Sequence, residues 1–254
     1  MFLFGTNLKM HQTPQQTREF VHALRDRAAR MPRIACATLW VTPPFTSIAA
    51  AAEAAQGSGI RIGAQNMHWA DEGAFTGEIS PLMLKACGAQ FVLLGHAERR
   101  TLFGETDEAL NKKVLAAARH GLGVMLCVGE PIAIKAAGAG EEYVAQQLKL
   151  ALRGLQAPCD LQVLYEPLWS VGEGGVAADP DYVGAAFDNI RRVLRGLFGA
   201  AGEHVPILYG GSVDATNCAR YVRLPNAGGM GVGRAGWNVE SFVAVLANAL
   251  AALD

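Results

Sequence analysis

Three side chains of this sequence are of types that move protons on small carbonyl compounds. Glu166, His96 and Lys9 each come directly or almost directly after a short apolar run. A glutamate can act as a base, a histidine can give or take a proton, and a lysine supplies fixed positive charge. Taken alone, Lys9 could be a solvated charge, His96 a packed histidine and Glu166 a strand-end carboxylate. Their shared position after apolar runs favours one catalytic site.

Two glycine-bearing loops complete this set. They read Tyr209-Gly210-Gly211-Ser212 and Gly231-Val232-Gly233-Arg234, and both close apolar runs. Backbone N–H groups in such loops and at helix N-termini bind phosphate. A Gly-Gly pair alone is more often a turn. Beside a base, a proton donor and a lysine, it indicates chemistry on a small phosphorylated carbonyl compound.

Eight apolar runs that alternate with helical segments must position these residues. The runs are Phe2–Asn7, Ile34–Val41, Ile60–Ala64, Phe91–Leu94, Val124–Val128, Gln162–Tyr165, Pro206–Tyr209 and Gly229–Val232. Eight strand–helix repeats in 254 residues predict an α/β fold, a closed (β/α)₈ TIM barrel that forms a single domain over residues 1–254. The competing open, doubly wound sheet needs a glycine-rich turn after its first strand, and Gly5-Thr6-Asn7-Leu8-Lys9 is not that fingerprint.

The helical segments carry recognisable ends. Thr13, Pro14 and Gln16 form a capping-box sequence that predicts a helix to about Ala29. The alanine-rich stretch Ile48–Ala55 predicts a buried helix. Other long helices are expected at Asp107–His120, Tyr143–Leu155, Pro180–Phe198 and Val239–Leu253.

Composition excludes several classes of partner. The net charge of -1 offers no basic field for nucleic acid or an anionic membrane surface. We expect no signal peptide and no membrane span, because the apolar start is brief and no apolar run is long enough. The five cysteines are scattered and lack CxxC spacing, which favours buried thiols in a reducing cytoplasm over disulfides or a metal site.

The chain resembles the triosephosphate isomerase family over nearly its whole length. Eight motifs in the family's order carry the resemblance: Asn7-Leu8-Lys9-Met10, Gly63-Ala64-Gln65-Asn66, Gly73-Ala74-Phe75-Thr76-Gly77-Glu78-Ile79-Ser80, Gly95-His96-Ala97-Glu98-Arg99-Arg100, Phe103-Gly104-Glu105-Thr106, Cys127-Val128-Gly129-Glu130, Tyr165-Glu166-Pro167-Leu168-Trp169 and Tyr209-Gly210-Gly211-Ser212-Val213. Any one motif is modestly specific, whereas all of them in order are very specific.

The resemblance implies a role for each site residue. Glu166 would be the base that moves a proton between neighbouring carbons, and His96 the electrophile that polarises the oxygens, because a glutamate base paired with a neutral histidine is the known pattern of this family. Lys9 would supply positive charge and Asn7 a hydrogen bond, with Glu98 in support. The reaction would interconvert dihydroxyacetone phosphate and glyceraldehyde 3-phosphate, in carbohydrate metabolism, without a metal or other cofactor.

The resemblance also implies how substrate and partner are bound. Gly172, Ser212, Gly233 and Arg234 occupy the phosphate-binding positions, and residues 167–176 would form a closing lid. The Met67–Ile79 loop would reach into a second copy of the chain and form a homodimer.

Three residues depart from the family pattern near the site. Arg234 stands where a second glycine is usual, Glu173 where the lid carries a threonine, and Ala97 where a serine follows the histidine. Arg234 could flank the phosphate, pair with Glu173, or point outward into a surface ion pair. Without the serine, Glu166 could rest in a different position.

These departures leave the substrate open. Together with His68-Trp69 and the sequence Gly233-Arg234-Ala235-Gly236-Trp237-Asn238, they resemble a divergent branch that isomerises L-erythrulose 1-phosphate to D-erythrulose 4-phosphate. A third interpretation, from another class, is a sugar-phosphate-binding barrel without catalysis. The intact set of Asn7, Lys9, His96 and Glu166 argues against it.

Overall fold

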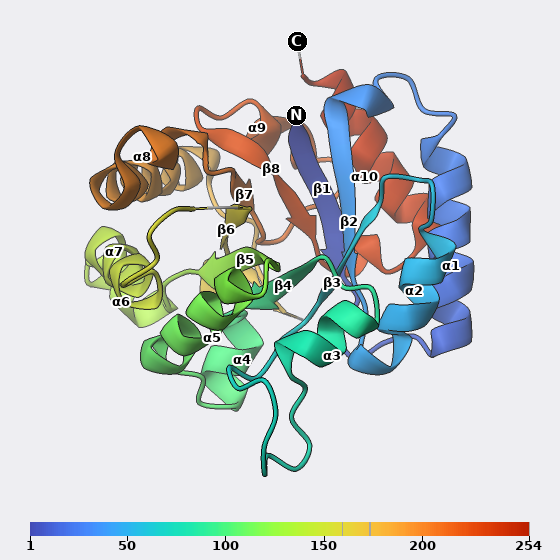
Figure 1. The fold of residues 1–254 in the computed structure, drawn as a ribbon. Helices are drawn as coiled ribbons and strands as arrows, with labels where there is room; N and C mark the ends of the chain where they lie inside the picture. Colours follow the sequence, from blue (N-terminus) through green and yellow to red (C-terminus); the bar gives the residue numbers. More distant parts are fainter. Residues whose placement is uncertain (159, 173, 254) are drawn as a thin grey trace.

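Parallel strands close into a barrel in the order of the sequence (Figure 1). The computed structural model describes residues 1–158, 160–172 and 174–253, and within them eight strands form the barrel wall. They are β1 Phe2–Asn7, β2 Ala37–Thr42, β3 Arg61–Ala64, β4 Phe91–Leu94, β5 Gly123–Val128, β6 Leu161–Tyr165, β7 Ile207–Tyr209 and β8 Ala227–Val232. Strand β8 pairs with β1 and closes the ring, so the predicted (β/α)₈ barrel is confirmed.

Most strand bounds agree with the apolar runs to within one or two residues, but the second strand begins later than predicted. Ile34–Cys36 forms a 3₁₀ turn and β2 starts at Ala37. Arg33 has a left-handed backbone with φ of 62°, and its carbonyl accepts the Cys36 N–H. This tight turn uses the residues that the sequence pattern placed in the strand.

Helices cover the outside of the barrel (Figure 1). They are α1 Pro14–Ala28, α2 Ile48–Ala54, α3 Pro81–Ala86, α4 Ala97–Leu102, α5 Asp107–Arg119, α6 Ile132–Ala136, α7 Gly140–Ala151, α8 Pro180–Phe198, α9 Cys218–Val222 and α10 Val239–Ala251.

Two of these helices show how local sequence sets their ends. The capping box of Thr13 and Gln16 is present at the start of α1, as predicted. Helix α7 begins before the predicted Tyr143 and ends before the predicted Leu155. Glu141 and Glu142 lie in its first turn, where negative charge favours a helix N-terminus.

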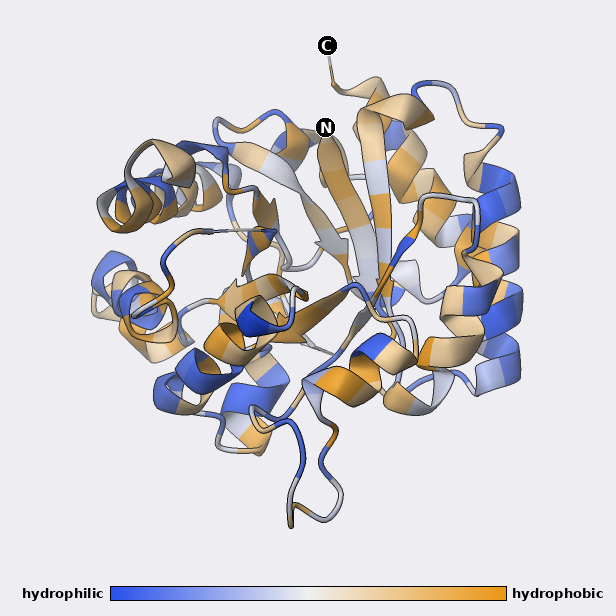
Figure 2. Ribbon diagram, viewed as in Figure 1, coloured by the Kyte–Doolittle hydropathy of each residue, from blue (hydrophilic) through white to orange (hydrophobic). Residues whose placement is uncertain are grey.

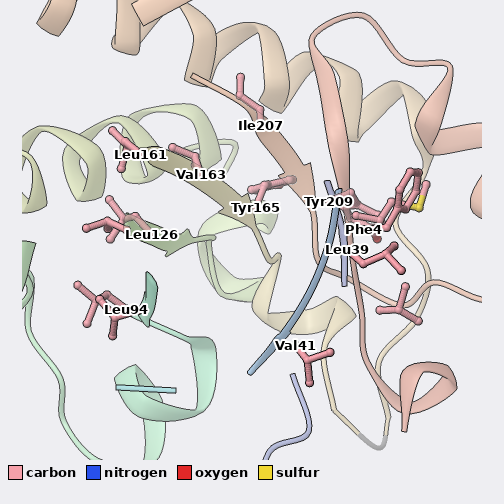
Figure 3. Close-up of a cluster of buried hydrophobic side chains, with 14 of the residues drawn as sticks. Phe4, Leu39, Val41, Leu94, Leu126, Leu161, Val163, Tyr165, Ile207 and Tyr209 are labelled. Carbon is pink, nitrogen blue, oxygen red and sulfur yellow. The ribbon is translucent and has the colours of Figure 1, made fainter. Parts of the chain in front are cut away.

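Apolar side chains form two separate cores because strand residues alternate in direction. The larger core lies between barrel and helices; Figure 3 shows Phe4, Leu126, Val163 and Ile207 among its members. The smaller core fills the barrel and is made by Trp40, Phe91, Leu93, Met125, Cys127, Leu164 and Leu208. Figure 2 shows the strands and the inner helix faces as predominantly hydrophobic, with hydrophilic residues on the outside.

Glycines make room for the two largest side chains of the barrel interior. A Cβ on Gly5 would collide with the Trp40 ring, and a Cβ on Gly63 would collide with the Phe91 ring. The two rings meet edge to face with centroids 6.2 Å apart. The Trp40 and Phe91 rings therefore occupy the space in the barrel interior that Gly5 and Gly63 leave without side chains.

One long loop projects from the barrel between β3 and α3 (Figure 1). The His68 N–H donates to the Ile79 carbonyl at 2.8 Å and closes the loop at its base. The His68 ring stacks on Trp69 and packs at a tilt against Phe75, with both centroid distances 4.2 Å. Separately, no helix in the described part of the chain is long and apolar enough to cross a membrane.

Candidate active site

A cavity of about 1050 Å³ opens at the carboxyl ends of the strands, where barrel enzymes carry their chemistry. The structure brings every predicted site residue to its wall: Asn7, Lys9, His96, Glu98, Glu166, Gly172, Ser212, Gly233 and Arg234. Residues from both ends of the sequence thus meet in one place.

Glu166 and His96 face each other inside the cavity. Glu166 Oε1 lies 3.6 Å from His96 Nε2, and the two residues are only 5% and 4% exposed. The other carboxylate oxygen, Oε2, is buried and has no hydrogen-bond partner among the described residues. A buried oxygen without a partner is costly, and it is available to accept a proton from a ligand.

A backbone contact fixes the tautomer of His96. Its Nδ1 accepts the Glu98 N–H at 3.2 Å, at the start of α4. A ring nitrogen that accepts a hydrogen bond carries no proton, so the proton of the neutral ring sits on Nε2. Nε2 is the atom that faces Glu166, and it can therefore donate to an oxygen placed between them.

Charged side chains hold the backbone just before His96. The Gly95 N–H donates to Glu105 Oε2 at 3.3 Å, and Arg100 Nε donates to the Gly95 carbonyl at 2.8 Å. Glu105 in turn pairs with buried Lys113 and with Arg99. Arg99 thus has a structural ion-pair role, and the turn after β4 is held from both sides.

Lys9 is fixed in an uncommon backbone conformation. Its φ is 51°, in the left-handed region that non-glycine residues rarely adopt. The Lys9 N–H donates to Asn7 Oδ1 at 2.9 Å, and Gln65 donates to the Lys9 carbonyl at 2.8 Å. Lys9 Nζ pairs with Glu98 Oε1 at 2.7 Å. Strained backbone of this kind clusters at functional sites, and here it aims the ammonium group into the cavity.

Two contacts from the predicted lid segment cross the expected phosphate corner. Arg234 Nη2 donates to the Gly172 carbonyl at 3.1 Å. The Arg234 side chain therefore extends across the corner to the backbone of Gly172. The Ser212 N–H donates to Ser170 Oγ at 3.1 Å. Glu173, the other expected partner of Arg234, lies outside the described residues.

Hydrogen bonds anchor both ends of residues 167–176, the predicted lid. Glu130, which is 1% exposed, accepts from Trp169 Nε1 at 3.0 Å, Tyr165 at 3.0 Å and Tyr182 at 2.9 Å. At the far end the Ala178 N–H donates to the Tyr209 hydroxyl at 3.1 Å, and that hydroxyl also bonds Ser170 Oγ at 3.0 Å. The segment between these anchors is tethered at two fixed points.

The side chains around Glu166 are neutral and closely packed. Cys127 is fully buried beside it, and burial first, with the Glu166 charge second, raises the pKa of the thiol well above its usual range. Ala97, which follows His96 directly, is also buried. A Cβ on Gly210 would lie 2.8 Å from Glu166 Cγ. The carboxylate is therefore buried and closely packed on this side.

Several residues of the cavity were not predicted from the sequence. Trp40, Leu164 and Gly231 form part of its floor. Leu164 and Gly231 stand two positions before Glu166 and Gly233, so strand alternation was the signal that could have found them. At the rim His11 packs on Trp237 with ring centroids 4.2 Å apart. That contact joins two loops from opposite ends of the sequence.

No cluster of three or more His, Cys, Asp or Glu suited to a metal ion occurs within residues 1–158, 160–172 and 174–253.

Comparison with known proteins identifies similar chains of two kinds. The family model described as triosephosphate isomerase matches residues 2–249. L-erythrulose-1-phosphate isomerase of Rhizobium rhizogenes is 40% identical over 256 residues, covering 99% of this chain and 96% of that protein. Triosephosphate isomerase of Moorella thermoacetica is 43% identical over 248 residues, covering 96% and 97%. A crystal structure of triosephosphate isomerase from Bartonella henselae superposes with a TM-score of 0.88 at 28% identity, covering 97% and 98%.

Proposed function

Because the chain belongs to the triosephosphate isomerase family and is an isomerase of the aldose–ketose type, we propose that its cavity interconverts dihydroxyacetone phosphate and glyceraldehyde 3-phosphate. The observation that carries this proposal is the pair of Glu166 Oε1 and His96 Nε2, buried 3.6 Å apart. A base and a proton donor at that spacing can address neighbouring atoms of one small substrate.

In the proposed reaction Glu166 removes a proton from the carbon next to the carbonyl. The electron pair moves to form an enediolate, and His96 Nε2–H donates to the oxygen that gains charge. His96 gives the Nε2 proton to that oxygen and takes up the proton of the neighbouring hydroxyl on the same nitrogen, and Glu166 returns its proton to the neighbouring carbon, so atoms and charge balance over the cycle. Lys9, held 2.7 Å from Glu98, contributes fixed positive charge beside the intermediate. The Asn7 oxygen accepts the Lys9 N–H, which leaves its NH₂ group to donate to substrate.

The phosphate would bind at the opposite corner, to the N–H groups of Gly172, Ser212 and Gly233 and to Arg234. Backbone donors and a guanidinium suit a dianion. The lid over this corner would exclude water and protect the enediolate from loss of phosphate. The anchors at Glu130 and Tyr209 support a lid that moves between fixed hinges.

A second candidate is the interconversion of L-erythrulose 1-phosphate and D-erythrulose 4-phosphate. It uses the same proton transfer on a ketose with one more carbon. The aromatic rim of His11 and Trp237 and the presence of Arg234 at the phosphate corner favour it, as does the relative of that name at 40% identity. A cavity of about 1050 Å³ has room for either substrate.

We also propose a homodimer built on the loop of residues 67–79 and a cytoplasmic location. Phe75 on the loop and Leu82, Met83, Leu102, Phe103 and Met10 elsewhere are large apolar side chains left exposed in the isolated chain. The described cysteines are all free thiols, which suits a reducing compartment. A molar mass of one chain, measured by light scattering at micromolar concentration, would refute the proposed homodimer.

The test is a pair of assays on the purified protein. kcat/KM is measured in parallel on glyceraldehyde 3-phosphate and L-erythrulose 1-phosphate, and a ratio of about 100 or more, worth roughly 2.7 kcal/mol, identifies the preferred substrate. Glu166→Gln should lower kcat by several orders of magnitude at similar substrate affinity. Turnover of neither substrate by the wild type would overturn the isomerase proposal in favour of a binding protein.

A further inference from the structure

A lysine lies over an aromatic ring at the start of the predicted lid, residues 167–176. Lys135 Nζ is 3.5 Å from the centroid of the Trp169 ring and 4.7 Å from that of the Tyr182 ring. The two rings meet edge to face, with their centroids 5.8 Å apart. All three side chains are half-buried, so water screens the attraction between the ammonium group and the rings only in part.

The short helix α6 places Lys135 at this point. It follows directly on Glu130 and Pro131, and the Lys135 N–H donates to the Pro131 carbonyl at 3.1 Å. Of the described residues, those that line the active-site cavity do not include Lys135; it lines a separate cavity of about 230 Å³ instead. Its charge therefore acts on the two rings and not on a substrate in the active site.

Trp169 connects this charge to both limbs of the predicted lid. Its ring donates from Nε1 to the Glu130 carboxylate at 3.0 Å. Its backbone carbonyl accepts the Val176 N–H, from the far limb, at 3.5 Å. The next residue, Ser170, accepts the Ser212 N–H at the expected phosphate corner. A contact that fixes the Trp169 ring therefore also fixes the backbone beside this corner.

We propose that Lys135 is a positioning residue of the active site, and that its ammonium group holds Trp169, and with it the predicted lid, over the phosphate corner. The Glu130 carboxylate holds the edges of the Trp169 and Tyr182 rings by accepting their N–H and O–H, and Lys135 holds their faces. A cation over an indole shifts such an equilibrium by a factor of roughly 2 to 30. This inference rests on the proposed isomerase function and concerns the control of its lid.

The experiment removes the charge and keeps the length of the side chain. Lys135→Met should weaken the binding of inorganic phosphate, measured by titration calorimetry, by roughly two- to thirtyfold. KM should rise by the same factor with kcat nearly unchanged, since the lid covers substrate and transition state alike. Lys135→Arg should restore both values, because a guanidinium also stacks on aromatic rings. Unchanged phosphate affinity and KM in Lys135→Met, or no recovery in Lys135→Arg, overturns the proposal.

Two comparisons show whether the charge acts through Trp169. Lys112→Met is the matched control, because Lys112 Nζ lies 5.0 Å from the centroid of the Trp69 ring, outside the predicted lid; it should change neither value. In a Trp169→Leu background, Lys135→Met should have no further effect on phosphate affinity. An equal loss in Lys112→Met, or a further loss of the same size in the Trp169→Leu background, refutes the role of Lys135.

The role of Lys135 and the isomerase proposal can fail separately. If the wild type turns over neither sugar phosphate but binds inorganic phosphate, the isomerase proposal fails and the phosphate titration alone decides on Lys135. A wild type that neither turns over substrate nor binds phosphate overturns both proposals. Circular dichroism melting identifies a variant that has not folded, and Lys135→Gln then takes the place of Lys135→Met.

Discussion

Ser170→Ala tests whether the Ser212 N–H binds phosphate. In the free protein this N–H donates to Ser170 Oγ at 3.1 Å, and Ser170 Oγ also bonds the Tyr209 hydroxyl at 3.0 Å. A phosphate that takes the N–H must first break its bond to Ser170. Such a hydrogen bond contributes about 0.5–1.5 kcal/mol of net free energy. Without Ser170 Oγ, phosphate affinity should therefore rise roughly two- to tenfold.

The assay is competitive inhibition by inorganic phosphate, with kcat and thermal stability measured on the same preparations. Ser58→Ala is the matched control, because Ser58 Oγ likewise accepts a backbone N–H, from Ile60 at 3.2 Å, and donates to the Ala55 carbonyl. Both variants should lose about 1 kcal/mol of stability, and only Ser170→Ala should bind phosphate more tightly. An unchanged or weaker inhibition constant in Ser170→Ala would refute the assignment of Ser212.

Three further predictions concern the lid anchor and the thiols. Glu130→Gln should lower the free energy of unfolding in urea by about 1–3 kcal/mol, because a buried carboxylate that accepts three hydrogen bonds becomes a neutral amide; unchanged stability contradicts this. Burial first, and the bond to Glu130 second, raise the pKa of Tyr182 from 10.0 to about 12. Its stabilising effect is complete below pH 10 and is lost as pH rises to about 12, so alkaline titration should destabilise the wild type more than Tyr182→Phe; equal losses would show that Tyr182 does not contribute. Iodoacetamide should alkylate exposed Cys36 and Cys87 in the native protein and spare Cys127, whose burial raises its pKa; peptide mass mapping that finds Cys127 modified as fast as Cys36 would contradict the packing beside Glu166.

The barrel could be predicted from the sequence because its signal is repeated and local. Each strand is a short apolar run, and the chain order alone gives the order around the barrel. The bounds failed where one residue changed the local geometry. Arg33 leads the backbone into a 3₁₀ turn before β2. Glu141 and Glu142 lie in the first turn of α7, which begins three residues earlier than predicted, at Gly140.

The placement of the site residues also followed from the barrel, because strand ends meet at one rim. Contacts between remote loops could not be predicted in this way. The bonds from Arg234 to Gly172 and from Ser212 to Ser170 depend on how two loops approach each other.

Proton transfer by Glu166 can be followed directly by deuterium exchange. Dihydroxyacetone phosphate is incubated with the protein in D₂O, and NMR follows the hydrogens on the carbon that bears the free hydroxyl. With the wild type, we predict that deuterium enters that carbon as isomerisation proceeds, whereas Glu166→Gln should show neither exchange nor product on the same timescale. Exchange or isomerisation by Glu166→Gln at the wild-type rate would contradict the role of Glu166 as the base.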